Sequence, residues 1–179
     1  GQDGGFGSPV ATTELWTAAS GGWTPGPDMA DARQFHAALS LPDGHALVVG
    51  GAAPTTLTNL AEWLAPGATG WKQAEFNLSL AHAHHTATLL PSGEVLVIGG
   101  ESPEALDSAL AQRLDGRTQR WCIAGHLLAS RKRHTATLLK SGKVLVAGGT
   151  SAGIPEPTAE LWEPAPGACV EPPGPSLEL

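Results

Sequence analysis

Short runs of apolar residues recur along the chain at a constant interval. The run HTATLLPSGEVLVIGG (85–100) is repeated as HTATLLKSGKVLVAGG (134–149), and in a looser form as HAALSLPDGHALVVGG (36–51). The three histidines that open these runs are 49 residues apart at both steps. A fixed period of roughly 20 to 50 residues is typical of architectures in which each repeat is one small structural module.

Each repeat predicts four short β-strands. HTATLL (85–90) supplies β-branched and apolar residues for a first strand, and the Ser-Gly pair after it predicts a hairpin turn. EVLVI (94–98) is a continuous apolar run, as in a strand that is buried on both faces. A block such as AELW (159–162) predicts the third strand, and the segment around a tryptophan such as Trp71 predicts the fourth.

Several positions keep their place in every unit and predict structural anchors. A Gly-Gly pair ends the second strand, where glycine tolerates a positive φ and leaves no Cβ to clash with a nearby backbone. An arginine precedes the first strand, except in the middle complete unit. The anchors are Arg33, His36, Gly50, Gly51, Trp23, His85, Gly99, Gly100, Trp71, Arg131, His134, Gly148, Gly149 and Trp121.

This pattern resembles the kelch repeat, in which an arginine precedes the first strand, a Gly-Gly pair follows the second and a tryptophan lies in the fourth. The resemblance covers nearly the whole chain. The sequence of residues 85–100 most resembles those of bacterial kelch proteins and of the propeller of the galactose oxidase group. The resemblance implies an all-β fold, a kelch-type β-propeller segment whose four-stranded blades surround a central channel.

The repeats divide the chain into about three and a half blades, which is an incomplete ring. Residues 1–26 predict a half blade that holds only strands three and four. Complete blades are expected at 27–75, 76–125 and 126–172, followed by a tail at 173–179. Closed propellers have about four to eight blades. We therefore expect either a fragment of a longer propeller or a chain that assembles with other chains to cover its open ends.

Composition narrows the classes of partner. The net charge is −7 and no long basic run exists, which argues against nucleic acid or an anionic membrane as the main partner. No apolar run reaches the roughly 18 residues that cross a bilayer, so no membrane insertion is expected. The first residues lack the regions of a signal peptide. The sequence does not assign a cellular compartment, although a secreted or periplasmic location is favoured.

The segment HAHH (82–85) raises the question of a metal site. In an extended segment His82 and His84 lie on one side and His85 on the other, and imidazoles with a third donor suit zinc or copper. A structural role is the stronger interpretation, because His85 recurs in every unit and His82 stands where the other units have arginine. His82 and His84 are the only metal candidates, and we expect neither a metal nor another cofactor.

No catalytic motif emerges. Galactose oxidase works through copper, tyrosine ligands and a tyrosine–cysteine crosslink, but this chain contains no tyrosine. Glu14, Glu62 and Glu160 could act as paired acids, yet their repetition marks them as structural positions of the third strand. Cys122 and Cys169 fall in the outer strands of different blades, and we expect no bond between them.

Trp63 departs from the repeat. The other units carry Leu15, Arg113 and Leu161 at its position. Packing within the strand is one interpretation, and a platform on which a ligand stacks is the other. Trp63 is therefore the candidate recognition residue.

The loops between the second and third strands, residues 52–59, 101–109 and 150–157, differ in sequence while the strands agree. Divergent loops on a repeated scaffold are where recognition usually occurs. We therefore expect a non-catalytic scaffold for protein or glycan recognition, with other copies of the chain or the remainder of a propeller as protein partners. The alternatives are part of a bacterial kelch-type oxidase or sugar-converting enzyme whose catalytic residues lie outside this chain, and a self-assembling structural protein.

Overall fold

The chain is all-β, as predicted. The computed structural model describes residues 8–75, 77–103, 107–115, 118 and 120–164. These residues form fifteen β-strands and no helix, so this part of the chain contains no helix that could span a bilayer.

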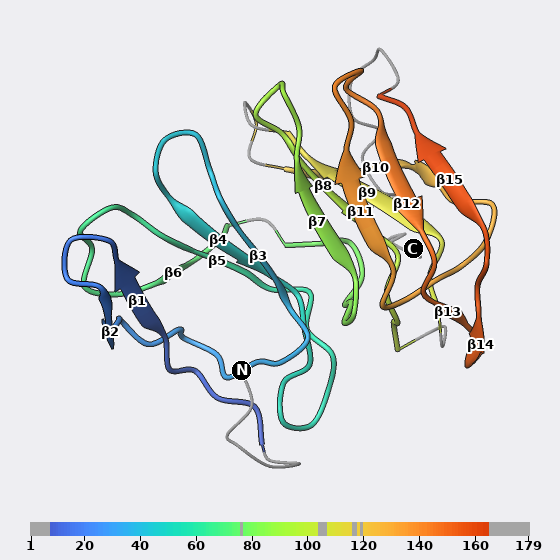
Figure 1. Cartoon of the computed structure of the whole chain (residues 1–179). Helices are drawn as coiled ribbons and strands as arrows, with labels where there is room; N and C mark the ends of the chain where they lie inside the picture. Colours follow the sequence, from blue (N-terminus) through green and yellow to red (C-terminus); the bar gives the residue numbers. More distant parts are fainter. Residues whose placement is uncertain (1–7, 76, 104–106, 116–117, 119, 165–179) are drawn as a thin grey trace, which may run out of the picture.

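Three larger antiparallel sheets follow one another along the chain (Figure 1). The first sheet contains β3 (Ala37–Ser40), β4 (Ala46–Val49), β5 (Ala61–Leu64) and β6 (Lys72–Gln73). The second contains β7 (Thr86–Leu89), β8 (Val95–Ile98), β9 (Leu110–Leu114) and β10 (Trp121–His126). The third contains β11 (Thr135–Leu138), β12 (Val144–Ala147) and β15 (Ala159–Trp162). Its expected fourth strand near Cys169 and the expected tail at 173–179 lie outside the described residues.

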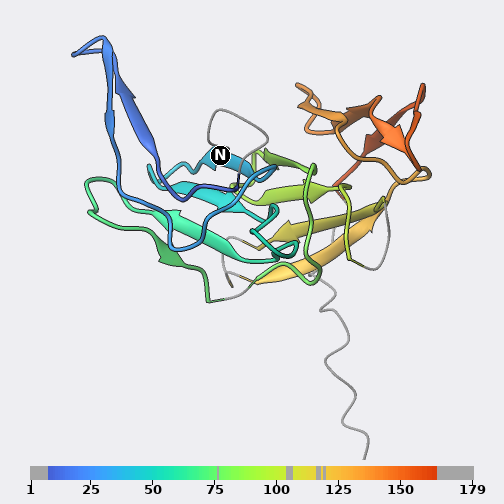
Figure 2. The same cartoon turned by 90° about the horizontal axis from the view of Figure 1, so that it is seen from below.

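Two hairpins complete the described strands. Strand β1 (Glu14–Thr17) pairs with β2 (Gly22–Pro25) close to the N-terminus, and Figure 2 shows this hairpin projecting from the rest of the molecule. Strands β13 (Thr150–Ser151) and β14 (Ile154–Pro155) form a short hairpin between β12 and β15. The Gly-Gly pairs directly follow β4, β8 and β12, which confirms their predicted place at the end of each second strand.

The register of the second and third strands is the same in all three sheets. The directly paired residues are Leu47 with Trp63, Leu96 with Arg113 and Leu145 with Leu161. Side chains alternate between the two faces of a strand. These pairs therefore mark one face of each sheet, and the residues on either side of them mark the other.

Two hydrophobic cores lie between neighbouring sheets, and each core joins the marked face of one sheet to the opposite face of the next. Their central residues are Leu47, Val49, Val95 and Val97 in the first core and Leu96, Ile98, Val144 and Val146 in the second. The first strands of neighbouring sheets contact each other, β3 with β7 and β7 with β11. This arrangement is compatible with a β-propeller-like fold, although the described sheets do not close into a ring.

The Gly-Gly pairs let neighbouring sheets approach closely. Gly99 has a φ of +64°, and a Cβ on it would lie 2.5 Å from the carbonyl oxygen of Arg131 and 2.7 Å from Cε1 of His134 in the next sheet. Gly50 has the same relation to His85. Gly148 has a similar φ of +67°, but nothing in the described structure lies within 4 Å of the corresponding position. Glycine therefore supplies both a backbone conformation and space at Gly99, and only the conformation at Gly148.

We expect Gly99→Ala to destabilise the protein more than Gly148→Ala. Both substitutions place a side chain at a left-handed φ, which costs about 1–2 kcal/mol. Only Gly99→Ala also pushes a methyl group into a packed neighbour, which adds about 1–3 kcal/mol. Free energies of unfolding from urea titrations measure the difference, and equal losses in the two variants would show that space between sheets is not what Gly99 provides.

Candidate functional site

The first sheet and the third sheet each contain a buried arginine that connects three segments of its own sheet. The Arg33 side chain is fully buried, and its Nη1 donates hydrogen bonds to the carbonyl oxygens of Gly50 at 3.0 Å and Leu60 at 2.9 Å. Its Nη2 forms an ion pair with Glu62. Arg131 repeats this geometry, with Nη2 2.7 Å from Glu160. These side chains join the end of the second strand, the start of the third strand and the segment before the first.

The middle sheet replaces the ion pair with two neutral side chains. His82 Nε2 lies 3.1 Å from Nε2 of Gln112, and both side chains are buried. Burial lowers the pKa of His82 to about 4, so its imidazole is neutral near pH 7 and accepts the hydrogen bond that the Gln112 amide donates. The Gln112 oxygen accepts a hydrogen bond from the Ser79 backbone N–H at 2.8 Å. His82 is therefore the middle sheet's counterpart of the buried arginine.

The repeated histidines lie between sheets. The His85 ring packs on Gly50 of the preceding sheet, and the His134 ring packs on Gly99. His134 Nε2 also shares a hydrogen bond of 3.0 Å with the Thr86 hydroxyl of the neighbouring sheet. Burial is the main cause that lowers the pKa of His85 to about 3 and that of His134 to about 4. His36 has its pKa lowered to about 4 by the same cause.

His84 is not in an extended segment, and that expectation was wrong. Its φ is +56°, and its ring stacks on Phe35 of the preceding sheet with 4.0 Å between ring centroids. Phe35 and Arg133 share this left-handed φ at the equivalent positions. Backbone hydrogen bonds of 3.0 Å from His84 N–H to Phe35 and of 2.9 Å from Arg133 N–H to His84 join successive sheets. The left-handed turn aims these backbone groups at the neighbouring sheet, which a strand conformation would not do.

No group of three or more histidine, cysteine, aspartate or glutamate side chains is arranged to hold a metal ion within the described ranges. His82 contacts Gln112 and His84 stacks on Phe35, so the two candidate ligands point to different partners.

Cys122 is disulfide-bonded. The expectation that it would have no bond was wrong, because a repeat pattern in the sequence does not report the distance between two cysteines. The chain's other cysteine, Cys169, lies outside the described residues.

The repeated tryptophans differ in their surroundings. Trp71 is half-buried, and its Nε1–H donates to the carbonyl oxygen of Pro27 at 2.9 Å. Trp23, on the β1–β2 hairpin, is 68% exposed. Trp121 is 5% exposed, yet its Nε1–H is buried without a hydrogen-bond partner in the described structure.

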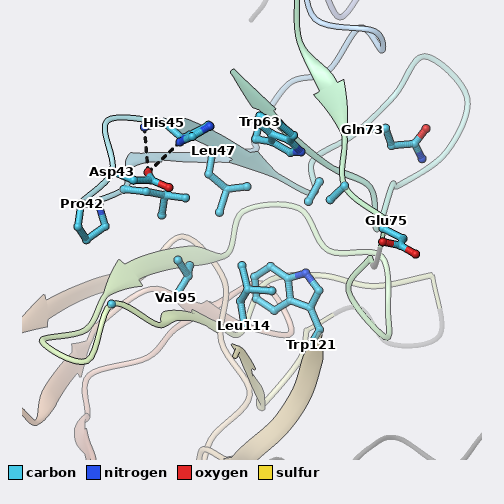
Figure 3. Close-up of a pocket in the computed structure, with 14 residues that line it drawn as sticks. Pro42, Asp43, His45, Leu47, Trp63, Gln73, Glu75, Val95, Leu114 and Trp121 are labelled. Carbon is cyan, nitrogen blue, oxygen red and sulfur yellow. Dashed lines mark hydrogen bonds and ion pairs between the residues drawn. The ribbon is translucent and has the colours of Figure 1, made fainter. Parts of the chain in front are cut away.

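A cleft of about 510 Å³ lies between the first and second sheets (Figure 3). Trp63 and Leu47 of the first sheet form one wall, and Val95, Leu114 and Trp121 of the second sheet form the other. Polar side chains flank these walls on both sides: Asp43, His45, Gln73 and Glu75. We call this space the Trp63 cleft.

The Trp63 cleft exists because a leucine stands where the next sheet has a tryptophan. Leu114 on β9 pairs with Val95, just as Trp162 on β15 pairs with Val144. Trp162 is 8% exposed, fills the space between the second and third sheets, and donates through Nε1–H to the carbonyl oxygen of Ala124 at 2.9 Å. Leu114 is smaller and leaves the corresponding space open.

The Trp63 ring contacts two polar side chains, those of His45 and Lys72. The His45 ring meets it edge-on, with centroids 5.0 Å apart, and Lys72 Nζ lies 5.4 Å from its ring centroid. His45 Nδ1 lies 2.9 Å from an Asp43 oxygen. The hydrogen bond from the His45 backbone N–H is the main cause that lowers the pKa of Asp43, so Asp43 is a carboxylate at neutral pH.

The sequence identified Trp63 but missed the rest of the cleft. The sequence predicts that Leu114 is an ordinary strand residue and that Trp121 is a structural anchor of the repeat. Comparison of Leu114 with Trp162 at the same repeat position was the one available signal for a local loss of volume.

Comparisons with known proteins do not assign this chain to a family. It matches no protein family model, and no curated protein matches it.

We expect the free energy of unfolding to fall as pH is lowered below about 6.5. His82, His85 and His134 have folded pKa values of about 4, 3 and 4, against about 6.5 in an unfolded chain. Unfolding therefore takes up protons between these values, and stability is full above pH 6.5 and is lost progressively toward pH 4. The slope approaches about 1.4 kcal/mol per pH unit for each histidine.

Urea titrations at several pH values between 7.5 and 5 measure this slope. The His82→Gln variant removes one of the groups and should reduce the slope by about one proton. Stability that does not change over this range in the unmodified protein would contradict the burial of neutral histidines.

Proposed function

We propose that this chain is a segment of a kelch-type β-propeller that works as a non-catalytic scaffold for recognising protein or glycan ligands. The observation that supports the proposal is that the three sheets have the same strand register but loops of different sequence. The three sheets share one strand register, whereas the loops at 52–59, 101–109 and 150–157 differ in sequence. A rigid scaffold with divergent loops is the usual arrangement of a recognition protein.

Contacts between loops support a continuous recognition surface at this end of the sheets. Asp107 accepts a hydrogen bond from the Ala152 backbone N–H of the next loop. Its carboxylate also lies 3.5 Å from Lys132 Nζ, and Lys132 donates to Glu101 at 2.6 Å. These contacts join the second and third sheets through a buried Asp107 side chain and the partly exposed side chains of Lys132 and Glu101.

Changes at a loop tip should weaken ligand binding without changing the fold. Residues 54–56 are exposed at the tip of the first loop, and their replacement by Gly-Ser-Gly removes side chains without removing the turn. We expect binding to weaken by at least about tenfold for ligands selected on a glycan array and from a displayed peptide library.

Lys140→Ser provides the matched control, because Lys140 lies in the β11–β12 turn at the opposite end of the strands. Equal weakening by both variants would contradict recognition through these loops. Chemical conversion of a bound glycan by this chain alone would contradict a non-catalytic role.

We further propose that the open ends bind either the remainder of a propeller or a second copy of the chain. Trp16 is 53% exposed on the β1–β2 hairpin, whereas Trp162, its counterpart in the third sheet, is 8% exposed. Leu161, on the uncovered face of the third sheet, is 52% exposed. Trp16 is therefore exposed at a position that is buried in the third sheet, and Leu161 lies on a sheet face that a neighbouring sheet covers in the other two sheets. Exposed apolar side chains of this kind support an interaction surface.

Leu161→Lys should weaken association of the protein with itself by about tenfold or more, since one buried leucine contributes about 1.5–3 kcal/mol. Sedimentation velocity over a range of concentrations measures this effect. Leu128→Lys is the control, because Leu128 is 97% exposed and lies outside both this sheet face and the three loops. A monodisperse monomer of the unmodified chain at all micromolar concentrations would refute self-association.

The disulfide at Cys122 supports a secreted or periplasmic location for this protein. Disulfides persist in oxidising compartments and are rare in the cytosol.

A further inference from the structure

The Trp63 cleft has the size of a small-molecule site. Its volume of about 510 Å³ lies within the range of roughly 300–1,000 Å³ that such sites occupy. The β3–β4 turn at 41–45 and Gly93 of the β7–β8 turn contribute to its lining, so it reaches the end of the sheets opposite to the loops at 52–59. It is therefore separate from the loop surface of the proposed function, and it extends that recognition role to a second site.

Trp121 presents an unused hydrogen-bond donor to this cleft. Its indole is 5% exposed, lines the cleft, and has a buried Nε1–H without a partner among the described residues. Figure 3 shows this nitrogen on the side of the ring that faces the cleft. Trp71, at the same position in the first sheet, satisfies its Nε1–H with the carbonyl oxygen of Pro27. A buried donor without a partner is unfavourable, so a ligand that supplies an acceptor is stabilised at Trp121.

The flanking groups restrict the chemistry of that ligand. Asp43 and Glu75 line the cleft, so an anionic ligand would meet like charge. An ammonium group has no lone pair and cannot accept the Trp121 hydrogen bond. A wholly apolar ligand would leave the same donor unsatisfied. A hydroxyl group both accepts from an N–H and donates to a carboxylate or amide oxygen.

We propose that the Trp63 cleft binds a neutral saccharide unit. The apolar face of the sugar ring packs on Trp63, as apolar surfaces pack on large aromatic rings. One hydroxyl accepts the hydrogen bond of Trp121 Nε1–H, and others donate to Gln73 and Glu75, which lie on one side of the cleft (Figure 3). This proposal goes beyond the loop surface, because it assigns a ligand to a second site.

Proton–nitrogen correlation spectra test the proposal directly, because they resolve the six indole N–H groups of the chain. The probes are the methyl glycosides of glucose, galactose, mannose and N-acetylglucosamine at up to about 10 mM, with glucuronate and glucosamine as charged counterparts. We expect at least one neutral glycoside to shift the Trp121 Nε1–H resonance in a saturable way, and glucuronate, whose carboxylate meets the like charges of Asp43 and Glu75, to bind more weakly.

Two variants in the cleft and one matched control sharpen the test. Leu114→Trp fills the cleft with the indole that the next sheet carries at this position, and Trp121→Phe keeps the ring but removes the donor. Both should weaken saccharide binding, followed at the Trp63 indole N–H resonance, by at least about tenfold. Trp71→Phe removes the equivalent donor outside the cleft and should leave binding unchanged. Trp121→Phe keeps the test valid if Leu114→Trp does not fold.

The proposal is overturned if no neutral glycoside shifts the Trp121 resonance, if only charged sugars bind, or if Trp71→Phe weakens binding as much as Trp121→Phe does. The loop-tip replacement at 54–56 separates this result from the proposed function. Loss of loop-dependent binding with saccharide binding retained contradicts only the loop surface, and the reverse result contradicts only the cleft.

Discussion

Each sheet of this protein has two apolar faces, and each face needs a neighbouring sheet to exclude water. Strand β8 shows the constraint most clearly, because all four of its residues, Val95–Ile98, are buried. One face of this strand belongs to the first core and the other to the second. No sheet in such an arrangement is stable alone, and the stability of each one depends on the contact with the next.

Close contact between sheets imposes its own requirements on the residues at each junction. The left-handed Gly50 and Gly99 leave space for the histidine rings of the following sheets, and the backbone at Phe35, His84 and Arg133 provides hydrogen bonds between sheets.

Burial also requires that polar side chains form hydrogen bonds or ion pairs within each sheet. Two kinds of pair satisfy the buried polar side chains at this position. The first sheet has an ion pair between Arg33 and Glu62, and the second has a neutral hydrogen bond between His82 and Gln112. A buried ion pair gains little over a neutral substitute, so partner satisfaction matters more at this position than charge.

The candidate ligand site arises where one junction departs from the repeat. Trp162 closes the space between the second and third sheets, whereas Leu114 leaves the space between the first and second sheets open. Trp63 departs from the repeat on the facing wall of the same space. The repeated residues form the scaffold, whereas Leu114 and Trp63, which differ from their repeat counterparts, form a cleft lined by groups that the other junction lacks.

The sequence by itself determined the strands of the three larger sheets that the structure describes, their order and the Gly-Gly positions, because these follow from local apolar patterns and from a constant period. It did not predict the β13–β14 hairpin, which lies in a segment expected to be a loop. It also singled out Trp63, which lacks a counterpart in the other units. Only the tertiary structure decided that Leu114 and Trp121 line the same space as Trp63, that Trp121 has an unused donor there, that His84 is left-handed and that Cys122 is bonded. These features depend on distances between neighbouring sheets, and residues about fifty or more positions apart carry no local pattern that reports such a distance.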